Sequence, residues 1–106
     1  EAMGGSGNGT NPEQLFAVGY AACFHSALRL VAGQQKADVS DSSVGAKVNI
    51  GPNDAGGFQL SVELEVTLPN LDHDTAQAIA DKAHEVCPYS NATRGNIDVT
   101  VTVTDD

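Results

Sequence analysis

The chain has 106 residues, of which 41% are hydrophobic and 18% are charged, as in an ordinary globular protein. This length suits one small domain rather than two. Five basic residues against fourteen acidic ones give a formal net charge of −9. This charge disfavours nucleic acid and anionic lipid as partners, because both bind positive surfaces. No apolar run approaches about 18 residues, so no membrane-spanning segment is expected.

The start of the chain combines a glycine-rich lead-in, residues 1–9, with the start signal of a helix. With Asn11 as N-cap, Pro12 takes the first helical position, where its missing N–H costs nothing. With Thr10 as N-cap, Glu13 would complete a capping box. Both alternatives predict the same start within one residue.

The first helix is predicted to run to Gly33, a typical C-terminal glycine. Between Leu15 and Phe24 it is apolar on nearly every side. A helix of this kind is buried all round. In so small a domain we expect it to lie between a sheet and another chain.

Two segments alternate apolar and polar residues and predict strands, residues 44–50 and 58–68. The segment between them, GPNDAGG, is typical of a hairpin connection. In the second strand the apolar residues share one face: Phe58, Leu60, Val62, Leu64, Val66 and Leu68.

A second helix is predicted from about Asp72 to Cys87, ended by Pro88. Its apolar stripe comprises Ala76, Ile79, Ala80, Ala83 and Cys87. A loop then leads to a last strand, residues 99–103, in which valines alternate with threonines. This order predicts one α+β domain, residues 1–106, with both helices on one face of an antiparallel sheet.

The two cysteines, Cys23 and Cys87, are open to more than one interpretation. Both could be inert packing residues, since free cysteine is often buried. A redox pair requires neighbouring sulfurs, which the helix faces permit but do not establish. The negative helix end disfavours a thiolate at Cys87, and Cys23 needs a cation or hydrogen-bond donors to ionise. Arg29 lies mostly on another face, and a structural role is favoured for Arg94.

A metal site is disfavoured. His84 and Cys87 share a helix face, but Cys23 and His25 point about 200° apart, so no complete tetrahedral ligand set is apparent. No role is predicted for His25, His73 or His84. The absence of an export signal favours the cytoplasm, where two cysteines remain free thiols.

Two motifs, NPEQLFAVGYAACF at residues 11–24 and CPYSNATRGNI at residues 87–97, resemble the organic hydroperoxide resistance (Ohr) branch of the OsmC/Ohr family. The resemblance covers residues 4–104. It implies an intertwined homodimer with active sites at its interface, which reduces organic and fatty-acid hydroperoxides to alcohols. It also implies that Cys23 attacks the peroxide and becomes a sulfenic acid, which Cys87 converts to a disulfide. A lipoylated protein or another dithiol would be the reductant, and no cofactor or metal is expected.

The resemblance gives Glu13 a second interpretation besides the capping box. In the family this glutamate pairs with an arginine and orients it toward the reactive cysteine. Ten residues of helix, about 15 Å, separate Glu13 from Cys23, so we expect it to serve a second, antiparallel chain. The family arginine comes from an N-terminal strand segment that is absent from this sequence, so the domain is expected to be N-terminally incomplete.

Phe16, Tyr20 and Phe24 are candidates for an apolar substrate-binding wall, although each could equally be a core residue. A non-catalytic thiol redox sensor, or a hydroperoxide-binding module, is the alternative function. A third possibility is a structural remnant with two inert thiols.

Overall fold

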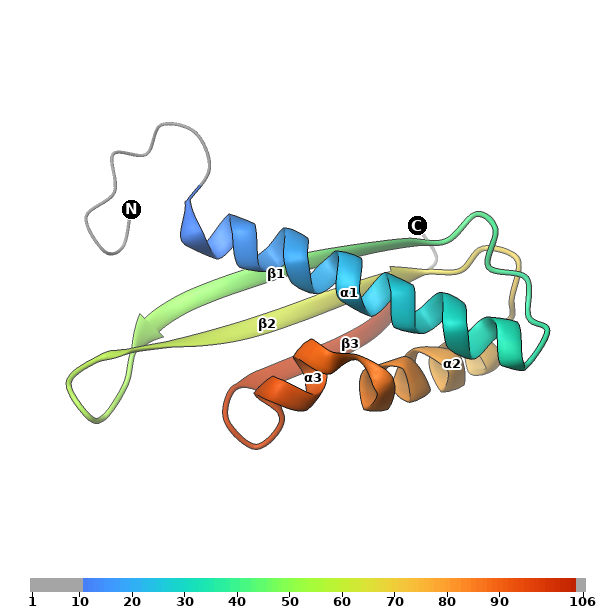
Figure 1. Cartoon of the computed structure of the whole chain (residues 1–106). Helices are drawn as coiled ribbons and strands as arrows, with labels where there is room; N and C mark the ends of the chain where they lie inside the picture. Colours follow the sequence, from blue (N-terminus) through green and yellow to red (C-terminus); the bar gives the residue numbers. More distant parts are fainter. Residues whose placement is uncertain (1–10, 105–106) are drawn as a thin grey trace.

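The computed structural model describes residues 11–104, in which three helices lie on one face of a three-stranded sheet (Figure 1). The predicted α+β fold is confirmed. The glycine-rich lead-in predicted for residues 1–9 lies outside the described residues. The elements are α1 (Pro12–Gln34), β1 (Ser43–Pro52), β2 (Phe58–Thr67), α2 (His73–Val86), α3 (Pro88–Thr93) and β3 (Asp98–Thr104).

The sheet has the order β1–β2–β3 and is mixed. Strands β1 and β2 pair antiparallel, with Pro52 opposite Phe58 beside the hairpin turn. Strands β2 and β3 pair parallel, with Ser61 opposite Asp98. The prediction of an antiparallel sheet is therefore wrong for β3. The reason is the crossover: α2 and α3 carry the chain back across the sheet, and a connection of this length joins parallel strands.

The predicted hairpin between β1 and β2 is confirmed, and Asn53 organises its turn. The Asn53 side-chain oxygen accepts hydrogen bonds from the backbone N–H groups of Ala55 at 3.0 Å and Gly57 at 2.9 Å. Gly56 has φ +86°, a left-handed conformation that glycine adopts without steric cost. This turn joins β1 and β2 in the register that places Pro52 opposite Phe58.

Helix α1 begins with Asn11 as N-cap and Pro12 at the first helical position. The Asn11 side chain accepts from the Gln14 N–H at 2.8 Å, and the Gln14 side chain accepts from the Asn11 N–H at 3.2 Å. The capping box thus uses Gln14, and the capping-box interpretation of Glu13 is wrong. The helix ends at Gln34, one residue beyond the predicted glycine.

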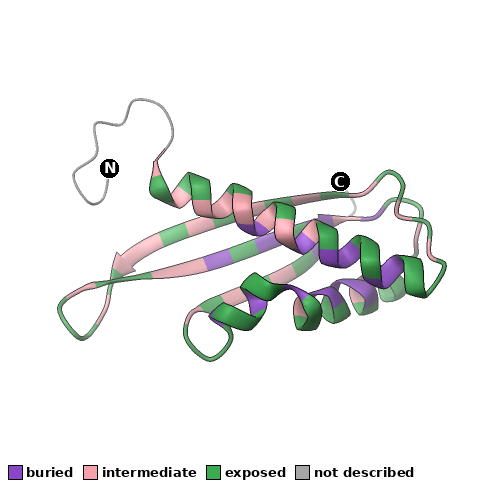
Figure 2. Ribbon diagram, viewed as in Figure 1, coloured by how far each residue is buried: buried purple, intermediate pink, exposed green. Residues whose placement is uncertain are grey.

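Helix α1 is buried on one face only (Figure 2). Tyr20, Phe24 and Leu28 are fully buried on the inner face, whereas Leu15 is 64% and Val18 is 68% exposed on the outer face. By length and composition alone this helix could cross a membrane, a possibility that the search for apolar runs missed. Its buried residues pack against the sheet and α2 in the core.

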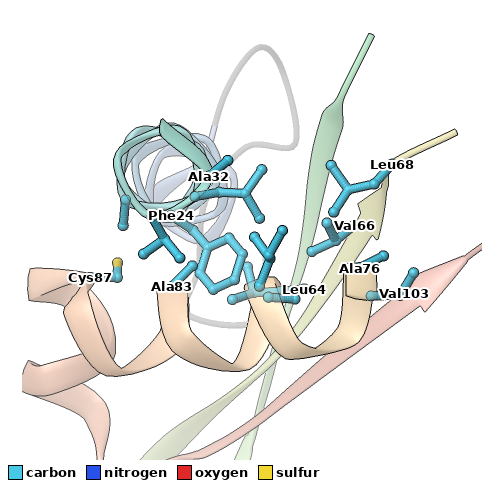
Figure 3. Packing of buried hydrophobic residues seen from close by; sticks show 14 of the residues in the cluster. Phe24, Ala32, Leu64, Val66, Leu68, Ala76, Ala83, Cys87 and Val103 are labelled. Carbon is cyan, nitrogen blue, oxygen red and sulfur yellow. The ribbon is translucent and has the colours of Figure 1, made fainter. Parts of the chain in front are cut away.

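The core lies between the sheet and the helices (Figure 3). Phe24 of α1, Leu64 of β2 and Ile79 of α2 have no exposed surface. The predicted apolar stripe of α2 is confirmed, because its members are buried together. The opposite face of β2 carries exposed Glu63 and Glu65. The alternation of apolar and polar residues in that strand therefore separates a buried face from an exposed one, as predicted.

Candidate functional site

The two cysteines meet in the folded chain although they lie 64 residues apart in the sequence. The Cys87 thiol donates toward Cys23, with the two Sγ atoms 3.3 Å apart. Both thiols are free; Cys23 is half-buried and Cys87 is fully buried. A disulfide bond is about 2.05 Å long, so bond formation needs a small approach of the two sulfurs. The structure thus shows that the two sulfurs are neighbours, which the sequence alone left open.

Cys87 reaches this position because it lies between α2 and α3 and belongs to neither helix. It has φ −60° and ψ 125°, the extended conformation that a residue before proline prefers. Its N–H donates to the Ala83 carbonyl at 2.8 Å and ends α2, while its carbonyl accepts from the Asn91 N–H at 3.0 Å and begins α3. The break leaves the Cys87 sulfur on the side that faces α1 (Figure 3).

The predicted loop after Cys87 is wrong, because residues Pro88–Thr93 form α3. Pro88 takes the first helical position, for which its fixed φ is suited. A helix of six residues is too short to show an amphipathic period, so the sequence carried no periodic signal for it.

Burial raises the pKa of the Cys23 thiol above its ordinary value. A hydrogen bond from the Tyr89 backbone opposes this shift, and the neighbouring Cys87 adds to it. Because the thiolate is the nucleophile, Cys23 needs a further cation or donor to react fast at neutral pH.

Neither arginine of the described residues supplies that activation. Arg94 donates to the His84 carbonyl at 2.7 Å and to the Asn91 side chain at 2.6 Å, so it fastens α3 to the end of α2. The predicted structural role of Arg94 is confirmed. Arg29 is exposed on α1, and its charge contributes, after burial, to a lowered pKa of His25.

A buried polar network lies beside the thiols. The Ser90 hydroxyl is 2.8 Å from the Tyr20 hydroxyl and 2.7 Å from His84 Nδ1. The Tyr20 hydroxyl is also 3.3 Å from that of Thr93. Tyr20 and Ser90 have no exposed surface. Sequence reasoning missed this network, because its members come from three separate segments and share no spacing that a motif search could detect.

Three aromatic rings pack together where α1 meets α3. Phe16 and Tyr89 stack with ring centroids 6.2 Å apart, and Tyr20 lies 5.8 Å from each of them. Tyr89, which the sequence did not single out, is 41% exposed and lies over Gly19. A Cβ atom at Gly19 would be 3.5 Å from the Tyr89 ring, an ordinary van der Waals contact, so the ring lies close against the backbone of α1. Phe24 is fully buried in the hydrophobic core, which also contains Tyr20.

An apolar groove of about 490 Å³ opens between α1 and the β1–β2 hairpin. Phe16 belongs to both the groove and the aromatic cluster, and thus connects them. Glu13 also lines the groove, about 15 Å along the continuous α1 helix from Cys23. Within one chain, therefore, Glu13 does not reach the thiols. The groove is lined by Pro12, Glu13, Phe16, Ile50, Gly57, Phe58 and Leu60.

Metal-ligating side chains do not gather at the site. Within residues 11–104, no three His, Cys, Asp or Glu side chains come together in a way that could hold a metal ion. His84 is bonded to Ser90, and His25 Nε2 lies 2.7 Å from the Ser42 hydroxyl.

Comparison with known proteins places these features in a family. The family model described as OsmC-like protein matches residues 5–102. An organic hydroperoxide resistance protein from Xanthomonas axonopodis pv. citri is 54% identical over 104 residues, which cover 97% of this chain and 72% of the relative.

Solved structures of such proteins share the fold. One from Elizabethkingia anophelis has a TM-score of 0.91 at 50% identity, covering 99% of this chain and 76% of that one. The structure of OhrB from Bacillus subtilis has a TM-score of 0.87 at 48% identity, covering 92% and 72%. The chain therefore belongs to the OsmC/Ohr family and is most similar in sequence to its organic hydroperoxide resistance branch.

Proposed function

We propose that this chain is a thiol-dependent peroxidase that reduces organic hydroperoxides, including those of fatty acids, to alcohols. The observation that carries the proposal is the 3.3 Å distance between the sulfurs of Cys23 and Cys87. The name of the Xanthomonas relative, organic hydroperoxide resistance protein, supports a role in peroxide detoxification. We propose a cytoplasmic location, where cellular reductants keep such thiols reduced.

The proposed cycle uses the two thiols in sequence. The Cys23 thiolate attacks one peroxide oxygen; the O–O bond breaks, an S–O bond forms, and the departing alkoxide takes a proton to become the alcohol. The Cys87 sulfur then displaces the hydroxyl group of the sulfenic acid. An S–S bond forms, and the hydroxyl leaves as water with the Cys87 proton. An external dithiol, which we propose is a lipoylated protein, reduces the disulfide by exchange.

The difference in burial supports this division of roles. Cys23 is half-buried and can meet a substrate, whereas Cys87 is fully buried behind it. A substrate oxygen can therefore reach Cys23 first. The groove supports the preference for organic peroxides, because its apolar walls can bury a hydrocarbon chain that hydrogen peroxide lacks.

Activation of Cys23 is proposed to come from a homodimer. Glu13 lies too far from Cys23 of its own chain, but an antiparallel partner would bring the two together across an interface. Leu15 and Val18 are two exposed apolar residues in the N-terminal half of α1 that such an interface would cover. The Glu13 carboxylate would not by itself favour the Cys23 thiolate; an arginine held between them would lower the pKa of Cys23, and neither Arg29 nor Arg94 of the described residues fills that role within one chain.

The alternative is a thiol redox sensor, which would use the same neighbouring sulfurs but would oxidise once and recycle slowly. Repeated turnover distinguishes the two functions. We expect the protein, with dihydrolipoamide in excess, to consume many equivalents of an organic hydroperoxide such as tert-butyl hydroperoxide. A single equivalent consumed per chain would favour the sensor.

Matched serine variants test the roles of the two thiols. Cys23→Ser should consume no peroxide above the uncatalysed rate, because it lacks the nucleophile. Cys87→Ser should still form a sulfenic acid at Cys23, which a dimedone probe traps, but should not form the intrachain disulfide. Equal activity of Cys23→Ser and the unmodified protein would contradict the proposal.

A further inference from the structure

The buried polar network connects the two segments that carry the thiols. Tyr20 precedes Cys23 by three residues on α1, and its hydroxyl lies 2.8 Å from that of Ser90. His84 and Ser90 flank Cys87, three residues before it and three residues after it, and lie 2.7 Å apart. Ser90 therefore joins the helix of Cys23 to both helices that meet at Cys87.

A donor and an acceptor can be assigned to each hydrogen bond between Tyr20, Ser90 and His84. Burial, followed by the charge of Arg94, lowers the pKa of His84, although Asp81 and Glu85 act in the opposite direction. Neutral His84 can therefore accept at Nδ1 from the Ser90 hydroxyl, which in turn accepts from the Tyr20 hydroxyl. The Thr93 hydroxyl has two acceptors within reach of its single proton, the Ser90 carbonyl at 3.1 Å and the Tyr20 hydroxyl at 3.3 Å.

Helix α3 depends on this network for its position. Six residues are too few for a helix to be stable alone. Its two buried side chains, Ser90 and Thr93, are both polar and both bond within the network. A shift of α3 would move Cys87, because the Cys87 carbonyl accepts the first hydrogen bond of that helix.

We propose that Ser90 and His84 are positioning residues that hold the Cys87 sulfur within reach of Cys23 and so accelerate disulfide closure. This inference rests on the thiol chemistry of the proposed function. In that step the S–O bond of the Cys23 sulfenic acid breaks, the S–S bond forms, and water leaves with the Cys87 proton. The sulfurs start 3.3 Å apart. A misplacement of about 1 Å costs on the order of 100-fold in rate, so loss of the network should slow closure measurably.

The rate at which the Cys23–Cys87 disulfide closes is best measured without peroxide. The assay starts from a mixed disulfide between Cys23 and a small aromatic thiol. One equivalent of an aromatic disulfide such as Ellman's reagent modifies the more accessible Cys23 and releases one thiolate. Attack by the Cys87 sulfur then forms the intrachain bond and releases a second coloured thiolate, whose rate reports closure directly. The first release serves as the internal reference for the reactivity of Cys23.

Four variants make the test specific. Ser90→Ala removes the junction of the network, and His84→Leu removes its acceptor. His84→Asn keeps an oxygen near the position of Nδ1 and is the conservative rescue. Ser42→Ala is the matched control, because it breaks another serine–histidine pair, in which the Ser42 hydroxyl lies 2.7 Å from Nε2 of His25 on α1.

We expect the second release to slow by about tenfold or more in Ser90→Ala and His84→Leu. Ser42→Ala should match the unmodified protein, and His84→Asn should recover most of the rate. Closure at the unmodified rate in both Ser90→Ala and His84→Leu would overturn the inference. If Ser90→Ala does not fold, the comparison of His84→Leu with His84→Asn decides the question. His84 is only half-buried, so both substitutions are expected to leave the fold intact.

The same proteins, treated with tert-butyl hydroperoxide, separate this inference from the proposed function. If the unmodified protein forms neither a sulfenic acid nor a disulfide, and Cys87→Ser forms no sulfenic acid, the proposed function fails. The closure assay still decides the role of the network, because it needs no peroxide. Slow closure together with normal sulfenic acid formation would support both.

Discussion

Closing the disulfide between Cys23 and Cys87 should stabilise the fold strongly, because the bond joins residues 64 positions apart. By loop-closure entropy, a cross-link over this length stabilises the native state by about 4 kcal/mol at 25 °C. The sulfurs start 3.3 Å apart, so closure should add little strain. At about 4–8 °C per kcal/mol for a domain near this size, the melting temperature should rise by roughly 15 °C or more.

Urea unfolding of the reduced and the oxidised protein, at one protein concentration, measures this difference in free energy. Oxidation with diamide forms the bond without any peroxide. Cys87→Ser, treated in the same way, is the control, because it cannot form the intrachain bond and should show no stabilisation. An oxidised protein that carries the mapped bond but is no more stable than the reduced one would refute the reasoning.

Three further predictions follow from burial. Because burial raises the pKa of Cys23 in the single chain, its alkylation by iodoacetamide, followed by mass spectrometry, should still accelerate with pH up to the ordinary thiol value of 9.0; a plateau at neutral pH would contradict this and would indicate that a cation outside the described contacts lowers the pKa. Leu64→Ala should lower the free energy of unfolding by about 2–5 kcal/mol, whereas Glu65→Ala, on the exposed face of the same strand, should change it by less than about 0.5 kcal/mol in urea unfolding. Phe16→Ala should raise the KM for a long-chain hydroperoxide by roughly tenfold, but leave that for hydrogen peroxide unchanged, because Phe16 lines the apolar groove.

The elements with a strong period could be predicted from the sequence. The alternation from Phe58 to Leu68 predicted β2 and the face of it that is buried, since side chains in a strand alternate between two environments. The apolar stripe of α2 was predicted in the same way. The start of α1 was predicted within one residue, because Asn11 and Pro12 carry local capping chemistry.

The direction of β3 could not be predicted from its residues. Valine–threonine alternation is the same in a parallel and an antiparallel strand. The direction follows from the crossover through α2 and α3, which is a tertiary property. Helix α3 was missed for a related reason, since it is held by Ser90 and Tyr20, which lie 70 residues apart in the sequence.

The candidate site was predicted only in part. The faces of α1 and α2 permitted Cys23 and Cys87 to meet, but only the extended conformation of Cys87 before Pro88 brings the sulfurs together. The aromatic contribution of Tyr89 was missed, because its position depends on the break between two helices.

The most direct test of the proposed chemistry is mass spectrometry of the reduced protein after one equivalent of an organic hydroperoxide. We predict a rapid loss of two hydrogens, mapped to a bond between Cys23 and Cys87, that forms more slowly with hydrogen peroxide. Two intact thiols after treatment, or an oxidised Cys23 beside an unreacted Cys87, would contradict the proposed cycle.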